Sequence, residues 1–312
     1  MLRRPTPEPL RRDPIPASRE VLRQVRRIDL RTRGLVNSRF SGEYQSVFKG
    51  QGIEFAEVRQ YLPGDDVRSI DWNVTARLGE PYLKRYHEER ELTVLLVVDF
   101  SGSQRWASRG RLKSEVVVEV AATLAMSAIR NNDRVGLLVT TSAVEWFVPP
   151  RKGRRHVLRL VRDLLAFEPR DRGTNLSAGL DYALRLAPSR SIIFLFSDFR
   201  LGDGWDEFGS TLTAAAARHD VVAVHLADRL DEALPAVGLI EVRDPETGQV
   251  TPLDTSSRQA QEAFAKAVSR DAEEARRLFR RRRVDEIRLR TDAPFGRELL
   301  AFFQRRERRR RR

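Results

Sequence analysis

The chain has 312 residues, a hydrophobic fraction of 41% and a net charge of +13. A hydrophobic fraction of this size is ordinary for folded domains and excludes wholesale disorder, and the length suffices for one large or two modest domains. Because the chain has no cysteine, disulfides and thiolate metal sites are excluded. No apolar run reaches the ~20 residues that a membrane span needs, so we expect a protein of the cytoplasm, either free or peripheral at the inner membrane face.

The excess positive charge lies at the two ends of the chain. Residues 1–40 and 305–312 are rich in arginine, whereas residues 41–304 carry no net charge. The folded body is therefore not expected to bind nucleic acid through a general basic surface. The Arg-rich tail, residues 305–312, could hold nucleic acid, anionic lipid or an acidic protein weakly through counterion release. The competing interpretation is a solvated chain end without a partner.

The N-terminal region is predicted to be a disordered lead-in, residues 1–17, followed by a helix. Five prolines lie in the lead-in among arginine and acidic residues. Ser18 is a suitable N-cap, and apolar residues follow at helical spacing from Val21 to Ile28. This basic amphipathic helix could lie on a membrane or on a partner, but packing against its own domain is the commoner use of such a stripe.

Residues 50–90 are predicted to form extended segments and turns, because glycine and proline interrupt them repeatedly. Together with the N-terminal helix they make one subregion, residues 18–90. Alternating charges surround a Pro-Gly turn in it, and the residues concerned are Arg59, Asp65, Asp66, Arg68, Asp71 and Trp72. Such a cluster favours a salt-bridged clasp that holds the subregion to the rest of the chain. A partner-docking or catalytic patch is the alternative.

From residue 92 onward, apolar strand-sized runs alternate with helical patterns. The predicted strands are 92–99, 134–140, 144–149, 191–197, 221–226 and 284–289, and the predicted helices are 112–129, 156–165, 176–186, 208–218, 256–283 and 298–303. Residues 244–248 are predicted to form a turn between two further short strands. This alternation predicts an α/β domain over residues 91–304, with a mostly parallel sheet covered by helices on both faces and a helical extension at its C-terminal end.

Polar side chains directly follow two of the predicted strands. Asp99, Ser101 and Ser103 come after the first strand, and Asp198 comes after a later one; Thr174 precedes a helix. Ligands of such sheets bind beyond the carboxyl ends of the strands, and Mg²⁺ takes about six oxygen ligands. The sequence therefore predicts a Mg²⁺ or Mn²⁺ site made of two carboxylates and three hydroxyls. A polar loop that only caps a helix is the competing interpretation.

The region around Asp99-Phe100-Ser101-Gly102-Ser103 resembles a von Willebrand factor A domain with its metal-ion-dependent adhesion site, which has a Rossmann-like sheet. From about Arg19 to its C-terminus the chain is similar to the bacterial "domain of unknown function 58" family. The most specific segment runs from Gly52 to Trp72. Supporting segments are Ala76-Arg77, Glu88-Glu89-Arg90, Asp133-Arg134-Val135-Gly136, Ser197-Asp198-Phe199, Asp244-Pro245-Glu246-Thr247-Gly248 and Phe302-Phe303.

The resemblance implies roles for the five oxygen-bearing residues. Ser101, Ser103 and Thr174 would touch the metal, Asp99 and Asp198 would act directly or through water, and an acidic residue of a partner would complete the shell. Many relatives have Met where this chain has Gln104, and adhesion-type domains often have Gly where it has Phe199. Neither position is a ligand, so these departures concern the rim of the site.

The resemblance also implies a function and a partner. Relatives are typically encoded beside MoxR-type AAA+ ATPases, so the chain is expected to be a non-enzymatic, metal-dependent protein-interaction module that serves such an ATPase as an adaptor in protein assembly or maturation. Two alternatives stay open. One is a Mg²⁺-dependent phosphoryl-transfer enzyme, although Ser101 stands where such enzymes usually carry a second aspartate. The other is binding of nucleic acid or anionic membrane through the basic ends.

Overall fold

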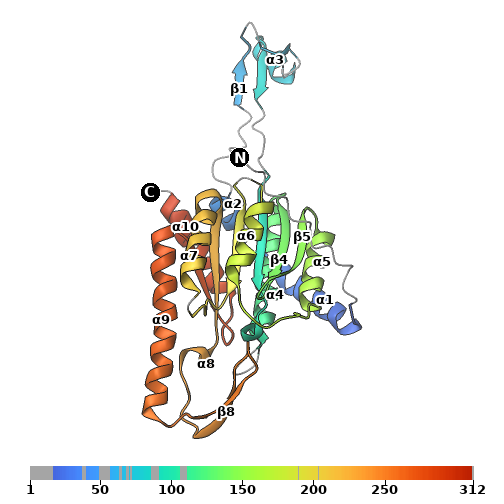
Figure 1. The fold of residues 1–312 in the computed structure, drawn as a ribbon. Helices are drawn as coiled ribbons and strands as arrows, with labels where there is room; N and C mark the ends of the chain where they lie inside the picture. Colours follow the sequence, from blue (N-terminus) through green and yellow to red (C-terminus); the bar gives the residue numbers. More distant parts are fainter. Residues whose placement is uncertain are drawn as a thin grey trace, which may run out of the picture. The chain divides into compact units, whose positions relative to one another are not determined.

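The structure is a computed structural model that describes residues 17–36, 40–48, 57–62, 65–67, 70, 72–85, 91–105, 111–188, 190–202 and 204–310 (Figure 1). The chain divides into two compact units, one made of Met1–Val47 with Leu92–Arg312 and the other of Phe48–Glu91. We predicted a single subregion over residues 18–90, but the N-terminal helix belongs with the sheet. The predicted lead-in, residues 1–17, lies outside the described residues except for its last residue.

A six-stranded sheet forms the centre of the first unit. Its strands are β3 (Thr93–Asp99), β4 (Arg134–Thr140), β5 (Val144–Arg151), β6 (Ile192–Ser197), β7 (Asp220–Ala227) and β10 (Asp285–Arg290). Their order across the sheet is β10-β7-β6-β3-β4-β5, and only β5 runs antiparallel to its neighbour. This is the strand order of Rossmann-like sheets, in which the chain reverses its direction of winding between the first and fourth strands. The predicted α/β fold class is confirmed.

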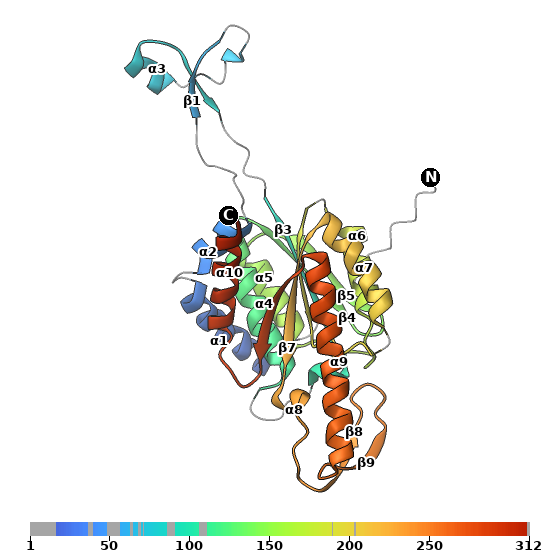
Figure 2. The ribbon, with the colours of Figure 1, turned by 90° about the vertical axis from the view of Figure 1, so that its left-hand side faces the viewer.

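Helices cover both faces of this sheet. Their bounds are α1 (Arg19–Leu35), α2 (Ser41–Phe48), α4 (Lys113–Arg130), α5 (Arg154–Leu165), α6 (Leu176–Leu186), α7 (Trp205–Arg218), α9 (Arg258–Arg282) and α10 (Gly296–Arg310). Figure 2 shows α1, α4, α5 and α10 on one face and α6, α7 and α9 on the other. Every residue of β3 and β6 is buried, which explains why parallel strands covered on both faces are continuous apolar runs in the sequence.

Three short elements lie near the carboxyl ends of the strands. They are the 3₁₀ helix η3 (Gly102–Arg105), the helix α8 (Arg229–Glu232) and the antiparallel hairpin of β8 (Leu239–Arg243) and β9 (Val250–Asp254). Both views show the hairpin beyond this edge of the sheet, at the same end as η3 and α8 (Figures 1 and 2). The turn predicted at residues 244–248 joins its two strands, as the sequence indicated.

The N-terminal helix packs on its own domain. Ser18 caps α1 by accepting a hydrogen bond from the Val21 amide. Val25 and Ile28 are buried, and α1 packs against α4 and α5. The Asp29 carboxylate pairs with Arg154 at 2.5 Å, on the first turn of α5. Of the two interpretations of this basic amphipathic helix, packing within the domain is therefore the one that the structure supports.

The closing helix is longer than predicted. We expected a helix over residues 298–303 and then an Arg-rich tail, but α10 continues to Arg310. Two arginines of that predicted tail are held by carboxylates of the sheet. Arg306 pairs with Asp220, and Arg309 donates two hydrogen bonds of 2.8 and 2.7 Å to Asp285. These ion pairs partly neutralise the positive charge of the tail.

The described residues of the second unit form a short antiparallel pair of strands and a helix. β1 (Glu57–Gln60) pairs with β2 (Tyr82–Arg85), and α3 (Trp72–Leu78) lies between them in the chain, where only extended segments and turns were predicted. The Asp65 carboxylate accepts a hydrogen bond from the Leu62 amide at 2.9 Å and thereby caps a local turn. Arg68 and Asp71 lie outside the described residues, so the clasp remains a prediction.

No helix among the described residues is long and apolar enough to cross a membrane.

Phe303 offers a test of how the two ends of the chain are joined. Its side chain is fully buried and makes edge-to-face contacts with Phe40 and Tyr44, at centroid distances of 5.1 and 6.2 Å. We expect Phe303→Ala to lower the free energy of unfolding by about 3–5 kcal/mol, because it leaves a cavity. Phe303→Leu keeps most of the volume and should cost less than about 1.5 kcal/mol. Urea unfolding followed by circular dichroism measures both, and equal losses would contradict this packing.

Candidate metal centre

The candidate site lies where the winding of the sheet reverses. β3 and β6 are parallel neighbours, and their carboxyl ends carry Asp99 and Asp198. Both carboxylates are almost completely buried, at 1% and 5% exposure. In open α/β sheets the loops that leave such a pair of strands diverge to opposite faces and leave a crevice for a ligand. The fold therefore places the two predicted aspartates together at the position where ligand binding is expected.

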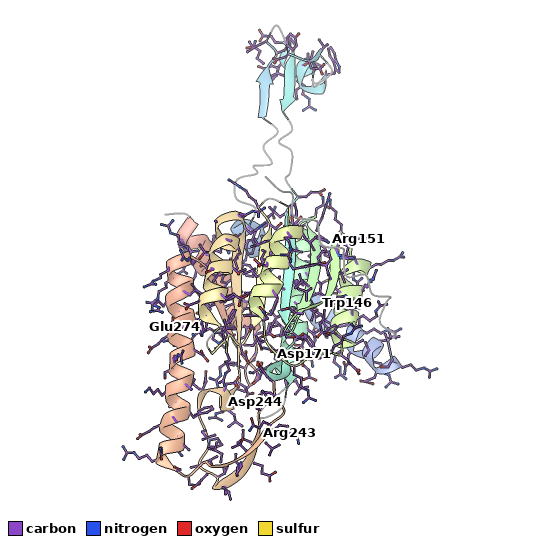
Figure 3. All side chains as sticks on the ribbon, viewed as in Figure 1. Trp146, Arg151, Asp171, Arg243, Asp244 and Glu274 are labelled. Carbon is purple, nitrogen blue, oxygen red and sulfur yellow. The ribbon has the colours of Figure 1, made fainter. Side chains whose placement is uncertain are left out.

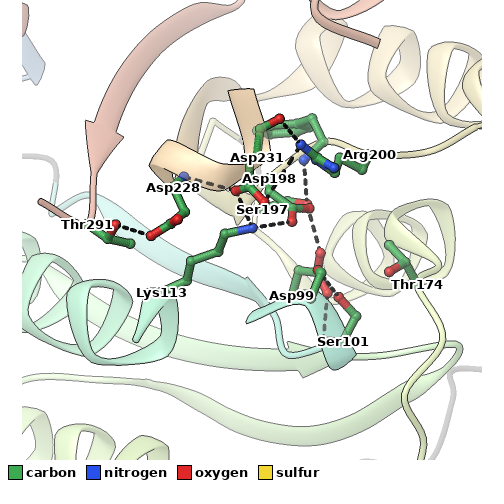
Figure 4. A network of polar contacts seen from close by, with 12 residues as sticks. Asp99, Ser101, Lys113, Thr174, Ser197, Asp198, Arg200, Asp228, Asp231 and Thr291 are labelled. Atoms are coloured by element: carbon green, nitrogen blue, oxygen red, sulfur yellow. Dashed lines mark hydrogen bonds and ion pairs between the residues drawn. The ribbon is translucent and has the colours of Figure 1, made fainter. Parts of the chain in front are cut away.

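Hydrogen bonds from both strands hold the Asp99 carboxylate. Its Oδ1 accepts from the Ser101 amide at 2.9 Å, and its Oδ2 accepts from the Ser197 hydroxyl at 2.7 Å (Figure 4). Because Ser197 ends β6, the second bond fastens the ends of the two strands together. The loop after Asp99 then turns through η3, which brings the Ser101 and Ser103 hydroxyl oxygens to 3.1 Å from each other. Three of the predicted site residues thus lie on one short, well-anchored loop.

The loop that carries Thr174 is built on a buried carboxylate. Glu145 on β5 is 6% exposed and accepts hydrogen bonds from the Thr141 hydroxyl at 2.7 Å and from the Arg170 amide at 2.9 Å. These bonds satisfy the charge of Glu145 in place of water. They also fix the course of the chain toward Thr174.

A main-chain hydrogen bond joins this loop to the Asp99 loop. The Gly102 amide donates to the Arg172 carbonyl oxygen at 2.8 Å. Beyond Thr174, the Asn175 side chain caps α6 through the Ala178 amide at 2.8 Å. Figure 4 shows the Thr174 side chain on its own loop, directed toward the ends of β3 and β6. The structure therefore brings Thr174 to the same edge as the two aspartates.

Lys113 is a member of the site that sequence reasoning missed. It is the first residue of α4 and is only 1% exposed. Its ammonium group lies 2.8 Å from Asp198 Oδ2 and 2.6 Å from Asp231 Oδ2 (Figure 4). A helix N-terminus favours acidic rather than basic side chains. A lysine at the head of an apolar helical pattern was therefore the one available signal that a buried carboxylate lies nearby.

The two buried aspartates differ in their electrostatic surroundings. Burial, together with the charge of Asp198, raises the pKa of Asp99 to about 7, although hydrogen bonds from Ser101 and Ser197 oppose the rise. Burial also acts to raise the pKa of Asp198, but the Lys113 ammonium outweighs it and holds that pKa below its ordinary value, with help from the Ser103 hydroxyl. Asp198 is therefore the more readily ionised member of the pair, and no cationic side chain among the described residues forms an ion pair with Asp99.

A further acidic residue reaches the site from the β8–β9 hairpin. The Thr174 hydroxyl donates a hydrogen bond of 2.5 Å to Glu246 Oε1. Burial and the nearby Asp198 raise the pKa of Glu246. In Figure 3 the Thr174 loop, marked by Asp171, and the hairpin, marked by Asp244, lie at the same end of the molecule. The segment containing Glu246 supports the family resemblance, but the sequence does not predict that it lies at the site. Glu246 is too far from Thr174 along the chain for their contact to be inferred from sequence.

The donor set fits a hard divalent cation only if hydroxyls take part. Among the described residues, no three His, Cys, Asp or Glu side chains are grouped so as to hold a metal ion. The oxygens at this edge come instead from a mixture of hydroxyls and carboxylates, and Mg²⁺ and Mn²⁺ accept such a mixture. Ser101 and Ser103 present adjacent hydroxyls here, and Thr174 presents a third with a carboxylate in contact.

The two departures from the family pattern have structural explanations. Gln104 is fully buried, and its side-chain amide has no hydrogen-bond partner among the described residues, so an apolar Met suits this position. Phe199 has a φ of 51°, in the left-handed region that favours glycine. Its ring is buried in edge-to-face contact with Phe279 at a centroid distance of 5.1 Å, which offsets the backbone strain.

The missing countercharge of Asp99 leads to a pH-dependent stability in protein freed of divalent ions. The folded-state pKa of about 7 exceeds the ordinary value of 3.8, so the unfolded chain loses this proton first and stability falls as the pH rises between these values. The side chain introduced by Asp99→Asn is neutral at every pH. The free energy of unfolding of this variant, relative to that of the wild type, should therefore rise by about 3 kcal/mol between pH 5 and pH 8. Urea unfolding with a chelator present measures the difference, and parallel pH profiles would contradict it.

Two mycobacterial proteins are similar to the chain in sequence. It is 30% identical over 288 residues to the uncharacterized protein Rv1480 of Mycobacterium tuberculosis, a match that covers 91% of this chain and 89% of that protein. It is 33% identical over 165 residues to the uncharacterized protein MAV169 of Mycobacterium avium, covering 52% of this chain and 94% of that one.

Similar solved structures include the conserved hypothetical protein BatB from Bacteroides thetaiotaomicron, with 15% identity, a TM-score of 0.43 and coverage of 70% of this chain and 99% of that one. The SpRpn10 VWA domain is similar with 9% identity and a TM-score of 0.40, over 67% of this chain and 94% of that one. The family model described as "Protein of unknown function DUF58" matches residues 57–274. Because this match spans more than half of the sequence, the chain belongs to that family, as its resemblance indicated.

Proposed function

We propose that this chain is a metal-dependent protein-interaction module that binds Mg²⁺ or Mn²⁺ and uses the ion to capture an acidic residue of a partner protein. The observation that carries the proposal is the meeting of Asp99, Ser101, Ser103, Thr174 and Asp198 at one edge of the sheet. These residues come from separate parts of the sequence. Topology places them where open α/β sheets bind ligands.

The hydrogen bonds divide the five residues into two groups. Ser101, Ser103 and Thr174 present hydroxyl oxygens and would touch the ion. Asp99 already accepts hydrogen bonds on both of its oxygens, and Asp198 is bound by Lys113. These two carboxylates would therefore act mainly through water or through the hydroxyls that they orient. When bound, the ion supplies a strong positive charge that attracts a further carboxylate.

The charge balance supports capture of a ligand in preference to catalysis. The Lys113 ammonium compensates Asp198, so part of the negative charge at the site is already neutralised before an ion binds. An ion held mainly by hydroxyls keeps a strong affinity for an outside carboxylate. Ser101 stands two residues after Asp99, where Mg²⁺-dependent phosphoryl-transfer enzymes usually carry a second aspartate, and its hydroxyl oxygen lies 3.1 Å from that of Ser103. The proposal therefore includes no enzymatic step.

The partner that we propose is a MoxR-type AAA+ ATPase, for which the module would act as an adaptor in protein assembly or maturation, in the cytoplasm or at the inner membrane face. This part rests on the family resemblance. A purified MoxR-type ATPase from the same genome should bind the chain in Mg²⁺ and release it in EDTA. Binding that is equally strong in EDTA would contradict a role for the ion in the contact.

Thr174→Val tests the ion site with little risk to the fold, because the two side chains have the same shape and Thr174 lies on a loop. We expect the variant to bind Mn²⁺ at least tenfold more weakly than the wild type, since even loss of an outer-shell partner of a metal costs about 10–100-fold. Isothermal titration calorimetry with Mn²⁺ and Mg²⁺ measures the difference.

The matched control is Thr251→Val, which makes the same change on an exposed strand position of the β8–β9 hairpin. It should bind like the wild type. Equal affinities of wild type and Thr174→Val, or no binding by the wild type, would reject the proposed ion site.

A further inference from the structure

The β8–β9 hairpin turns one acidic side chain inward. Asp244, Pro245 and Thr247 are exposed, whereas Glu246 is partly buried against the site. Its Oε1 accepts the hydrogen bond from Thr174 at 2.5 Å. Thr174 is one of the hydroxyl-bearing residues that we assign to the ion. The carboxylate of Glu246 therefore lies next to the proposed coordination sphere, and it comes from the chain itself.

Hydrogen bonds within the turn hold the backbone around Glu246 in place. The Asp244 carboxylate accepts hydrogen bonds from the Glu246 amide at 2.8 Å and from the Thr247 amide at 2.9 Å. Gly248 has a φ of 73°, in the left-handed region where glycine is favoured. The direction of Glu246 is therefore set by the backbone of the turn, and its side chain loses little freedom when it points into the site.

The turn also fits closely against the Asp99 loop. A Cβ atom at Gly102 would collide with the carbonyl oxygen of Pro245, so only glycine leaves room for this approach. Gly102 stands between the two serines whose hydroxyls we assign to the ion. The hairpin thus meets the site at two independent places, through Pro245 at the Asp99 loop and through Glu246 at the Thr174 loop.

We propose that Glu246 is an internal ligand of the bound ion and fills the place that a partner's carboxylate would take. This inference rests on the proposed function. A partner could then reach the ion only if the β8–β9 hairpin withdraws, so the hairpin would act as a built-in competitor. Because Glu246 belongs to the same chain, it would compete at an effective concentration on the order of millimolar, and a partner's carboxylate would have to bind strongly enough to displace it.

The charges at the site support this role. Glu246 is partly buried at the same edge of the sheet as the buried carboxylates of Asp99 and Asp198, so acidic side chains gather there. A divalent ion between Thr174 and the Asp99 loop would offset their mutual repulsion. A purely structural hydrogen bond between Thr174 and Glu246 is the alternative, and it would leave the ion's water shell unaffected by Glu246.

The test measures both the affinity for Mn²⁺ and the number of water molecules on the bound ion. The full chain is compared as wild type, Glu246→Ala and Glu241→Ala, where Glu241 is an exposed carboxylate on β8 of the same hairpin. Calorimetry gives the affinity for Mn²⁺ alone. Water-proton relaxation at saturating protein reports how many water molecules exchange on each bound Mn²⁺. Circular dichroism checks that each variant is folded.

We expect Glu246→Ala to bind Mn²⁺ about tenfold more weakly and to show a higher relaxation rate for each bound ion, because water replaces the lost carboxylate. Glu241→Ala should match the wild type in both measurements. An unchanged relaxation rate in Glu246→Ala would overturn the inference even if its affinity fell, since the effect would then be only the loss of a nearby charge. If the wild type binds Mn²⁺ and Thr174→Val does not, that result leaves the proposed function standing. If the wild type binds no Mn²⁺, both fail together.

Discussion

Two carboxylates are buried side by side where β3 and β6 end, and the structure around them is arranged to make their burial tolerable. An uncompensated buried charge costs several kcal/mol. Asp198 is compensated by the Lys113 ammonium at 2.8 Å, which it shares with Asp231 on α8 at 2.6 Å. Asp99 receives only hydrogen bonds, and burial raises its pKa to about 7. Within the part of the chain that the structure describes, Asp99 therefore has no cationic partner, and it lies at the edge of the sheet where a bound metal ion would supply the opposite charge.

The sequence predicted the sheet well, for a physical reason. Strands covered on both faces must be apolar throughout, so β3 and β6 are recognisable from composition alone, and an aspartate that follows such a run must lie at the sheet's edge. What it could not predict were contacts between distant segments. Lys113 and Asp198 are 85 residues apart, and Thr174 and Glu246 are 72 apart. The length of α10 was missed for the same reason, because the carboxylates that neutralise its arginines lie on other elements.

The β8–β9 hairpin links a distinctive segment of the sequence to the candidate metal centre. Within the family match over residues 57–274, its turn is a segment that sequence alone marks as distinctive without explaining. The structure provides an explanation in the approach of Pro245 to Gly102 and of Glu246 to Thr174. If the proposed function is correct and Glu246 binds the ion, the ion is exposed only when a partner or a conformational change displaces the hairpin. Binding would then be regulated by the equilibrium of one small element.

The most direct test of the ion site is a crystal structure grown in MnCl₂ with diffraction data collected at the manganese absorption edge. We predict one strong anomalous peak at the carboxyl ends of β3 and β6, within coordination distance of the Ser101, Ser103 and Thr174 hydroxyls and of the Glu246 carboxylate. Absence of an anomalous peak there would contradict the central claim.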